Sequence, residues 1–220
     1  MKKSKIFVAI DTTKISKAKK IIKETKTDKI KIGYKFGLEF INSKNGRSFI
    51  SKIKKKIIFA DLKLNDIPNT CVSTVKAIKD LKINYLTIHI SSGLDALKTT
   101  KKICASIKLV GVTTLTSLNN KNLKEIGYNK SLKNLIIHQS KLAQKAKLDA
   151  IVCSPNEVNY VRKFFKKEII TPGVRFDKNK QDQKRTMHPS KIKSDWLVCG
   201  RIITKGNIKN NLKKLIQYLN

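Results

Sequence analysis

Short apolar segments alternate with longer, lysine-rich segments along most of the chain. The apolar segments have the length and residue types of buried β-strands. The segments between them repeat apolar residues at helical spacing, as in residues 72–81, 132–146 and 208–219. Strands that are apolar on both faces and separated by helices indicate a parallel sheet. The eight predicted strands are residues 6–10, 30–33, 57–60, 85–90, 108–112, 150–153, 169–171 and 196–199.

Eight β/α units within 220 residues favour a closed (β/α)8 barrel over an open sheet. No linker, low-complexity tail or Gly/Ser tract divides the chain, so we expect residues 1–220 to form one barrel domain. The N-terminal apolar run is too short for a signal peptide core, and no run reaches membrane-spanning length. We therefore expect a soluble, cytoplasmic protein.

The cysteines and histidines are scattered. Cys71, Cys104, Cys153 and Cys199 show no metal-site spacing and lie in apolar or helical surroundings, which is typical of buried, reduced thiols in a cytosolic protein. The three histidines are equally dispersed. The sequence therefore predicts no metal site.

The net charge of +34 has two competing interpretations. It is typical either of a protein that binds polyanions or of a composition biased towards Lys, Ile and Asn. Lysines recur in nearly every segment, arginines are scarce, and aromatic residues, at 6%, do not interleave with basic ones. This distribution favours compositional bias, with no specific nucleic-acid partner.

The strongest chemical pattern is Asp61, Lys63 and Asp66 at the end of the third predicted strand. Residues two apart on a strand share a face, so Asp61 and Lys63 lie together, and a following turn can bring Asp66 towards the same ammonium. A lysine held between two carboxylates stays protonated, which makes it a proton donor. Taken alone, such a pattern is more often a surface ion-pair cluster.

Polar residues also follow the other predicted strands, and barrel enzymes place their chemistry at the carboxyl ends of the strands. The loops after strands seven and eight commonly bind phosphate. Here Gly173 and Gly200 permit close backbone approach, and Arg175 and Arg201 supply charge-assisted contacts. The rim residues expected to converge are Asp11, Lys31, Asp61, Lys63, Asp66, Thr116, Ser117, Ser154, Arg175 and Arg201.

In these motifs the chain resembles the orotidine 5′-phosphate decarboxylase family. The resemblance covers nearly the whole chain in the family's order, and its D-x-K-x-x-D-I-P element at residues 61–68 is specific. Two departures are modest, because Asn65 replaces a common histidine and Ile10 a frequent leucine. The segments that carry the resemblance are residues 8–11, 31–33, 61–70, 115–117, 152–154, 171–175, 182–183 and 200–204.

The resemblance implies a catalytic group of Lys63, Asp61, Asp66 and Lys31. Lys63 would be the proton donor, and Asp61 the carboxylate set against the substrate's own carboxylate. Lys31 would bind ribose hydroxyl groups together with Asp11.

The resemblance also implies a homodimer with shared active sites. Asp66, Ile67 and Thr70 would reach into the neighbouring subunit's site. Within one subunit, Thr116 would bind the pyrimidine edge. The phosphate would be held by Arg175, Gln183, Gly200 and Arg201, with residues 176–185 closing as a lid.

The implied reaction converts orotidine 5′-monophosphate (OMP) to UMP, the last step of de novo pyrimidine nucleotide synthesis, with no cofactor and no membrane partner. Three alternatives stay open. A Schiff-base lyase would need a neutral lysine, which flanking carboxylates disfavour. A hexulose-phosphate synthase resembles the chain in its D-x-K-x-x-D strand but binds a metal. A non-enzymatic scaffold would bind polynucleotides through its charge alone.

Overall fold

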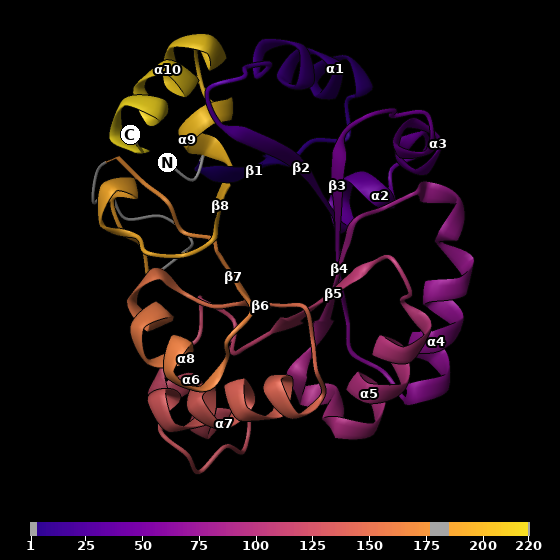
Figure 1. Ribbon diagram of the computed structural model, residues 1–220, viewed down its shortest axis with the longest axis vertical. Helices are drawn as coiled ribbons and strands as arrows, with labels where there is room; N and C mark the ends of the chain where they lie inside the picture. Colours follow the sequence, from indigo (N-terminus) through magenta and orange to yellow (C-terminus); the bar gives the residue numbers. More distant parts are fainter. Residues whose placement is uncertain (1–3, 177–184, 220) are drawn as a thin grey trace.

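A closed ring of eight parallel strands forms the centre of the computed structural model, which describes residues 4–176 and 185–219 (Figure 1). Each strand pairs with the next one in the chain, and β8 pairs with β1 to close the ring. The predicted (β/α)8 barrel is therefore confirmed. The strands are β1 (Lys5–Ile10), β2 (Lys31–Gly37), β3 (Ile57–Leu64), β4 (Tyr85–His89), β5 (Lys108–Val112), β6 (Ala150–Val152), β7 (Glu168–Thr171) and β8 (Trp196–Cys199).

Helices surround the ring and cover the outer face of the strands (Figure 1). The α-helices are α1 (Ile15–Glu24), α2 (Leu38–Ile41), α3 (Gly46–Ser51), α4 (Pro68–Ala77), α5 (Gly93–Ile103), α6 (Asn120–Glu125), α7 (Leu132–Lys145), α8 (Val158–Phe164), α9 (Arg201–Thr204) and α10 (Ile208–Leu219). The 3-10 helices are η1 (Lys79–Leu81), η2 (Ile90–Ser92), η3 (Pro155–Glu157) and η4 (Pro189–Lys191). Within the described residues, no helix combines the length and apolar character that crossing a membrane requires.

The second strand differs from its prediction, because β2 continues to Gly37 instead of ending at Gly33. Tyr34 and Phe36 pack into the core between strands and helices, and Lys35 between them breaks the run of apolar residues beyond Gly33. The carboxyl end of β2 therefore lies beyond Lys35. This shift changes which lysine reaches the rim of the barrel.

Two apolar cores hold the barrel together. The outer core lies between the strands and the helices, and the inner core fills the barrel itself. In the inner core, Phe7 stacks on Trp196 with ring centroids 4.1 Å apart and contacts Phe59 and Tyr85 at 4.9 and 5.1 Å. These four rings form an aromatic plug beneath the carboxyl ends of the strands.

Polar contacts close the amino-terminal end of the barrel below the plug. The Glu168 carboxylate accepts hydrogen bonds from Tyr85 at 2.9 Å, Lys108 at 3.0 Å and Lys5 at 3.3 Å. Burial, together with the negative charge of Glu168, raises the pKa of Tyr85, so its hydroxyl stays a proton donor. These hydrogen bonds stabilise the amino-terminal end of the barrel.

Gly33 provides the space that the Phe7 ring fills. A Cβ at position 33 would lie 2.6 Å from Phe7 Cε1 and 3.2 Å from Ile57 Cβ. We predict that Gly33→Ala lowers the free energy of unfolding by about 1–3 kcal/mol, the usual cost of overpacking a core. Urea unfolding followed by circular dichroism measures the change.

Gly37→Ala, on the same strand, is the matched control. Its added Cβ would meet only Lys35 Nζ at 3.5 Å, an ordinary van der Waals distance. If both variants lost the same stability, the loss would come from the backbone of β2 and not from the crowded Phe7 ring.

Candidate active site

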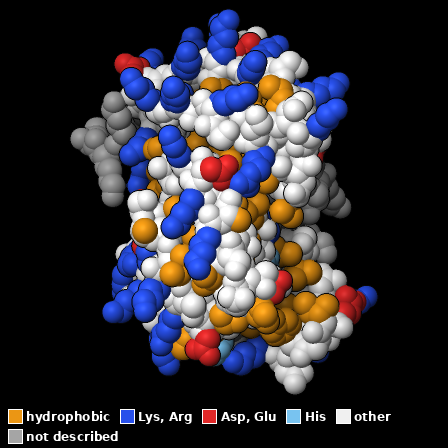
Figure 2. Space-filling view, turned by 90° about the vertical axis from the view of Figure 1, so that its right-hand side faces the viewer, with side chains coloured by type: hydrophobic (Ala, Val, Ile, Leu, Met, Phe, Trp, Pro, Cys, Tyr) orange, Lys and Arg blue, Asp and Glu red, His pale blue; other side chains and the backbone are white. Residues whose placement is uncertain are grey.

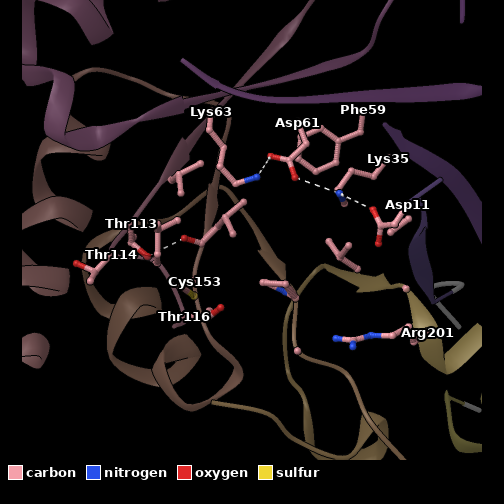
Figure 3. A pocket seen from close by; sticks show the side chains of 18 of the residues that line it. Asp11, Lys35, Phe59, Asp61, Lys63, Thr113, Thr114, Thr116, Cys153 and Arg201 are labelled. Carbon is pink, nitrogen blue, oxygen red and sulfur yellow. Dashed lines mark hydrogen bonds and ion pairs between the residues drawn. The ribbon is translucent and has the colours of Figure 1, made fainter. Parts of the chain in front are cut away.

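A cavity of about 260 Å³ opens at the carboxyl ends of the strands (Figure 3). Phe59 belongs both to the plug and to the cavity floor. The location agrees with the rule that barrel enzymes place their chemistry at this end. The lining residues that bear polar groups are Asp11, Lys35, Asp61, Lys63, Thr113, Thr114, Thr116, Cys153, Arg175 and Arg201.

Four of these side chains form a row of alternating charge along β1, β2 and β3 (Figure 3). Lys35 Nζ lies 3.7 Å from Asp11 Oδ1 and 3.1 Å from Asp61 Oδ2. Lys63 Nζ lies 3.0 Å from Asp61 Oδ1. Each carboxylate thus contacts at least one ammonium, and Asp61 contacts two.

Asp61 is the buried centre of this row, with 8% of its surface exposed. Burial by itself would raise the pKa of its carboxyl. The ammonium groups of Lys35 and Lys63 outweigh burial, and the net pKa is lowered. Thr87 donates a further hydrogen bond to Asp61 Oδ1 at 3.2 Å. Asp61 is therefore a fixed anion that holds both lysine side chains in place.

Lys63 reaches the cavity from an irregular backbone. Its φ is +51°, a left-handed conformation that is uncommon for a non-glycine residue, and the β3–β4 register shifts between Ala60 and Leu64. The Lys63 N–H donates to Thr87 Oγ1 at 2.7 Å, which compensates for the interrupted ladder. Asp61 and Lys63 do face the same cavity, as predicted, but a bend contributes as well as strand alternation. Strained backbone of this kind is enriched at functional sites.

Asp66 does not reach the ammonium that we expected it to share. Its Oδ1 accepts the Ile67 N–H at 2.7 Å, and among the ion pairs of the described residues Lys63 is joined only to Asp61. The prediction of a second carboxylate beside Lys63 within one subunit is wrong, because the chain turns directly into α4. Asp66, Ile67 and Thr70 are exposed at the start of that helix, outside the cavity lining.

The predicted rim position of Lys31 is also wrong. Lys31 is the first residue of β2, pairs in register with Lys5, and borders a separate cavity at the amino-terminal end beside Glu168. The residue at the rim is Lys35, four positions later on the same face. The alternation of Ile32, Tyr34 and Phe36 with other residues could have revealed that the strand continued.

The predicted arginine side of the cavity is present. Arg175, Arg201, Gly173 and Gly200 all line it, and Gly173 has a φ of +81°, which suits glycine. Gln183 lies outside the described residues, as does most of the predicted lid at 176–185. Thr116, another predicted rim residue, also lines the cavity.

The wall opposite the charged row consists of residues 113–116 (Figure 3). Thr113 Oγ1 donates to the Val152 carbonyl at 2.8 Å, and the Thr114 N–H donates to Gln139 Oε1 at 2.9 Å. Only Thr116 of this wall was predicted from the sequence, because threonines after a strand carry little specific signal. A neutral hydrogen-bonding wall, a charged row and two arginines suit an anionic, heterocyclic ligand.

Two other kinds of site receive little support. Within residues 4–176 and 185–219, no three His, Cys, Asp or Glu side chains are grouped so that they could hold a metal ion. On the face shown in Figure 2, lysine and arginine side chains are scattered and do not form one stripe. That scatter agrees with the compositional interpretation of the net charge.

The depressed pKa of Asp61 makes a prediction about stability. A carboxyl whose pKa is lower in the folded state stabilises the fold above its unfolded-state pKa, and this contribution is lost as the pH falls through the folded-state pKa. The stability advantage of wild type over Asp61→Asn should therefore shrink as the pH falls from about 5, just above the unfolded-state pKa, to about 1–2. Urea unfolding of both proteins across that range measures the difference.

Asp95→Asn, at an exposed position outside the cavity lining, serves as the control for removing one carboxylate. A stability difference between wild type and Asp61→Asn that stayed constant with pH would contradict the role of Asp61 as a charged anchor.

Comparisons with known proteins agree with the geometry. The sequence model of the Orotidine 5′-phosphate decarboxylase / HUMPS family matches residues 4–215. Proteins named orotidine 5′-phosphate decarboxylase from Wolbachia pipientis and from Wolbachia sp. subsp. Brugia malayi are 40% and 41% identical to the chain over 221 residues, covering 96% of each chain.

Solved structures show the same fold. The orotidine 5′-phosphate decarboxylase of Lactobacillus acidophilus superposes with a TM-score of 0.83 at 26% identity, covering 99% of both chains. The enzyme of Methanocaldococcus jannaschii, crystallised with the inhibitor BMP, has a TM-score of 0.79 at 24% identity, covering 99% of both chains.

Proposed function

The chain belongs to the orotidine 5′-phosphate decarboxylase / HUMPS family, and on this premise we propose that it converts OMP to UMP and carbon dioxide, the last step of de novo pyrimidine nucleotide synthesis. The observation that carries the proposal is the alternating row of Asp11, Lys35, Asp61 and Lys63 along one side of a cavity that also holds two arginines. We propose a reaction that requires no metal and no organic cofactor.

Lys63 is the proposed acid. Loss of carbon dioxide from C6 of the pyrimidine leaves an sp2 carbanion without an adjacent π system to delocalise it, so enzymes must supply as much as about 20 kcal/mol in such cases. The Lys63 ammonium stabilises the developing negative charge and then delivers a proton to C6. Its ion pair with Asp61 at 3.0 Å supports a charged, positioned donor.

Asp61 is proposed to face the carboxylate of the substrate. Its lowered pKa and two ammonium partners support a carboxylate that stays charged near a second anion. Repulsion between the two carboxylates would be relieved as carbon dioxide departs. The same charge keeps Lys63 oriented towards the reacting carbon.

Lys35, and not Lys31, lies at the cavity. Together with Asp11, it is proposed to bind the ribose hydroxyl groups, because the two side chains lie 3.7 Å apart at the rim. The phosphate is proposed to bind Arg175, Arg201 and the backbone near Gly200, with Gln183 contributing from outside the described residues. Thr116, on the neutral wall, is proposed to bind the pyrimidine edge.

We propose a cytoplasmic homodimer in which each subunit completes the other's site. The Asp66 side chain lies outside its own cavity, and the neighbouring Ile67 is an apolar residue with 66% of its surface exposed. Apolar side chains gather in the lower part of the face seen in Figure 2, which offers surface for such a contact. The four described cysteines are free thiols, in keeping with a reducing compartment.

We predict that Lys63→Ala folds normally but forms UMP at least about a hundredfold more slowly, the usual contribution of a positioned acid. A spectrophotometric assay of OMP consumption in the presence of EDTA tests both the variant and the function. OMP consumption that vanished in EDTA would contradict the proposed metal-free reaction, and a wild-type protein that did not consume OMP would favour the metal-dependent synthase, the other branch of the family.

Lys35→Ala tests the rim position, and Lys31→Ala is its matched control, because both variants remove one ammonium from the same strand. The first should lower kcat/KM by at least about tenfold, and the second should change it by less than about twofold. Similar losses in both variants would mean that net charge, and not the rim position of Lys35, determines activity.

The shared site predicts complementation between inactive variants. In a refolded equimolar mixture of Lys63→Ala and Asp66→Ala, about half the dimers are mixed and each has one complete site, so about a quarter of wild-type activity should return. A mixture of Lys63→Ala with Lys35→Ala should recover none, because both lysines act within one subunit. Failure of the first mixture to recover activity would contradict a shared site.

A further inference from the structure

A buried ion pair lies behind the neutral wall of the cavity. Glu157, at the end of η3, has 2% of its surface exposed, and its Oε1 is paired with the Arg185 guanidinium, whose side chain is 12% exposed. Neither residue is among those that line the cavity. The pair joins the start of the chain segment 185–189 to the loop after β6.

The same guanidinium binds the wall itself. Arg185 donates to the carbonyl oxygens of Leu115 at 2.8 Å, Thr114 at 3.3 Å and Thr116 at 3.4 Å. One planar group therefore ties three consecutive peptide groups of the cavity wall. A rigid fork of this kind fixes both the distance and the direction of its partners, which a lysine ammonium does not do.

Glu157 holds that guanidinium in position. Its Oε2 accepts the Ser154 N–H at 2.9 Å, so one carboxylate connects the loop after β6 to the arginine. A buried carboxylate is costly without a cation, and a buried guanidinium is costly without an anion. The Glu157 carboxylate and the Arg185 guanidinium therefore stay paired. Through them the 113–116 wall is connected to the loop after β6.

We propose that Arg185 is a positioning residue that shapes the 113–116 wall to receive the pyrimidine edge, with Glu157 as the group that orients it. The inference rests on the proposed function, because it takes the ligand to be a pyrimidine nucleotide. It extends that function to a residue that does not contact the cavity. Arg185 lies between β7 and β8 in the sequence, as Arg175 and Gln183 do, but its guanidinium binds the 113–116 wall and Glu157, so the expected effect is on recognition of the base.

The test compares a ligand that has the base with one that lacks it. UMP and ribose 5-phosphate are used as competitive inhibitors of OMP turnover. Arg185→Lys should raise the inhibition constant of UMP at least about tenfold while changing that of ribose 5-phosphate by less than about twofold. Thermal unfolding establishes that the variant is folded.

Arg47→Lys is the matched control. Arg47 also joins a backbone carbonyl, that of Ala77 at 2.7 Å, to a carboxylate, that of Asp80 at 2.6 Å, but it is exposed and outside the cavity lining. This variant should leave both inhibition constants unchanged. If Arg185→Lys does not fold, Glu157→Gln replaces it, since it keeps the shape of the orienting group and should show the same selective loss.

The outcomes are separable. Equal weakening of UMP and ribose 5-phosphate, or no weakening of either, would overturn the role of Arg185 while leaving OMP turnover intact. Absence of OMP turnover in the wild-type protein would overturn the proposed function and this inference with it.

Discussion

The candidate site depends on one buried carboxylate held between two ammonium groups. Asp61 bears the cost of desolvation only because Lys35 and Lys63 contact it on two sides, and these lysines would repel one another without it. The three groups arise from adjacent strands of a closed ring, which limits their movement. The charges are thus arranged before any ligand binds, and such preorganisation is commonly the largest contribution to enzymatic rate.

The net charge makes this arrangement more informative. The chain has 49 basic and 15 acidic residues, yet the row in the cavity contains two of each. A composition biased towards lysine does not by itself bring scarce carboxylates to one rim. The local balance therefore indicates a functional constraint that operates against the general composition.

The barrel was predictable because its strands are mostly continuous apolar runs, whose number and spacing leave few alternative folds. The site was only partly predictable. The sequence predicts Lys31 and not Lys35 at the rim, because the polar Lys35 inside β2 makes the strand look shorter than it is. The left-handed turn at Lys63 depends on Thr87, a partner from another strand. Arg185 gave no local signal, because its partners lie 28 or more residues away and become neighbours only in the folded barrel.

Phe59 links the barrel's interior to its chemistry, since its ring belongs to the aromatic plug and also forms the floor of the cavity. A smaller residue within the plug would leave a void, and the neighbouring rings would relax into it. The depth at which a ligand rests would then change together with the melting temperature. A substitution in the plug is therefore expected to change both the thermal stability of the barrel and the fit of the ligand in the cavity.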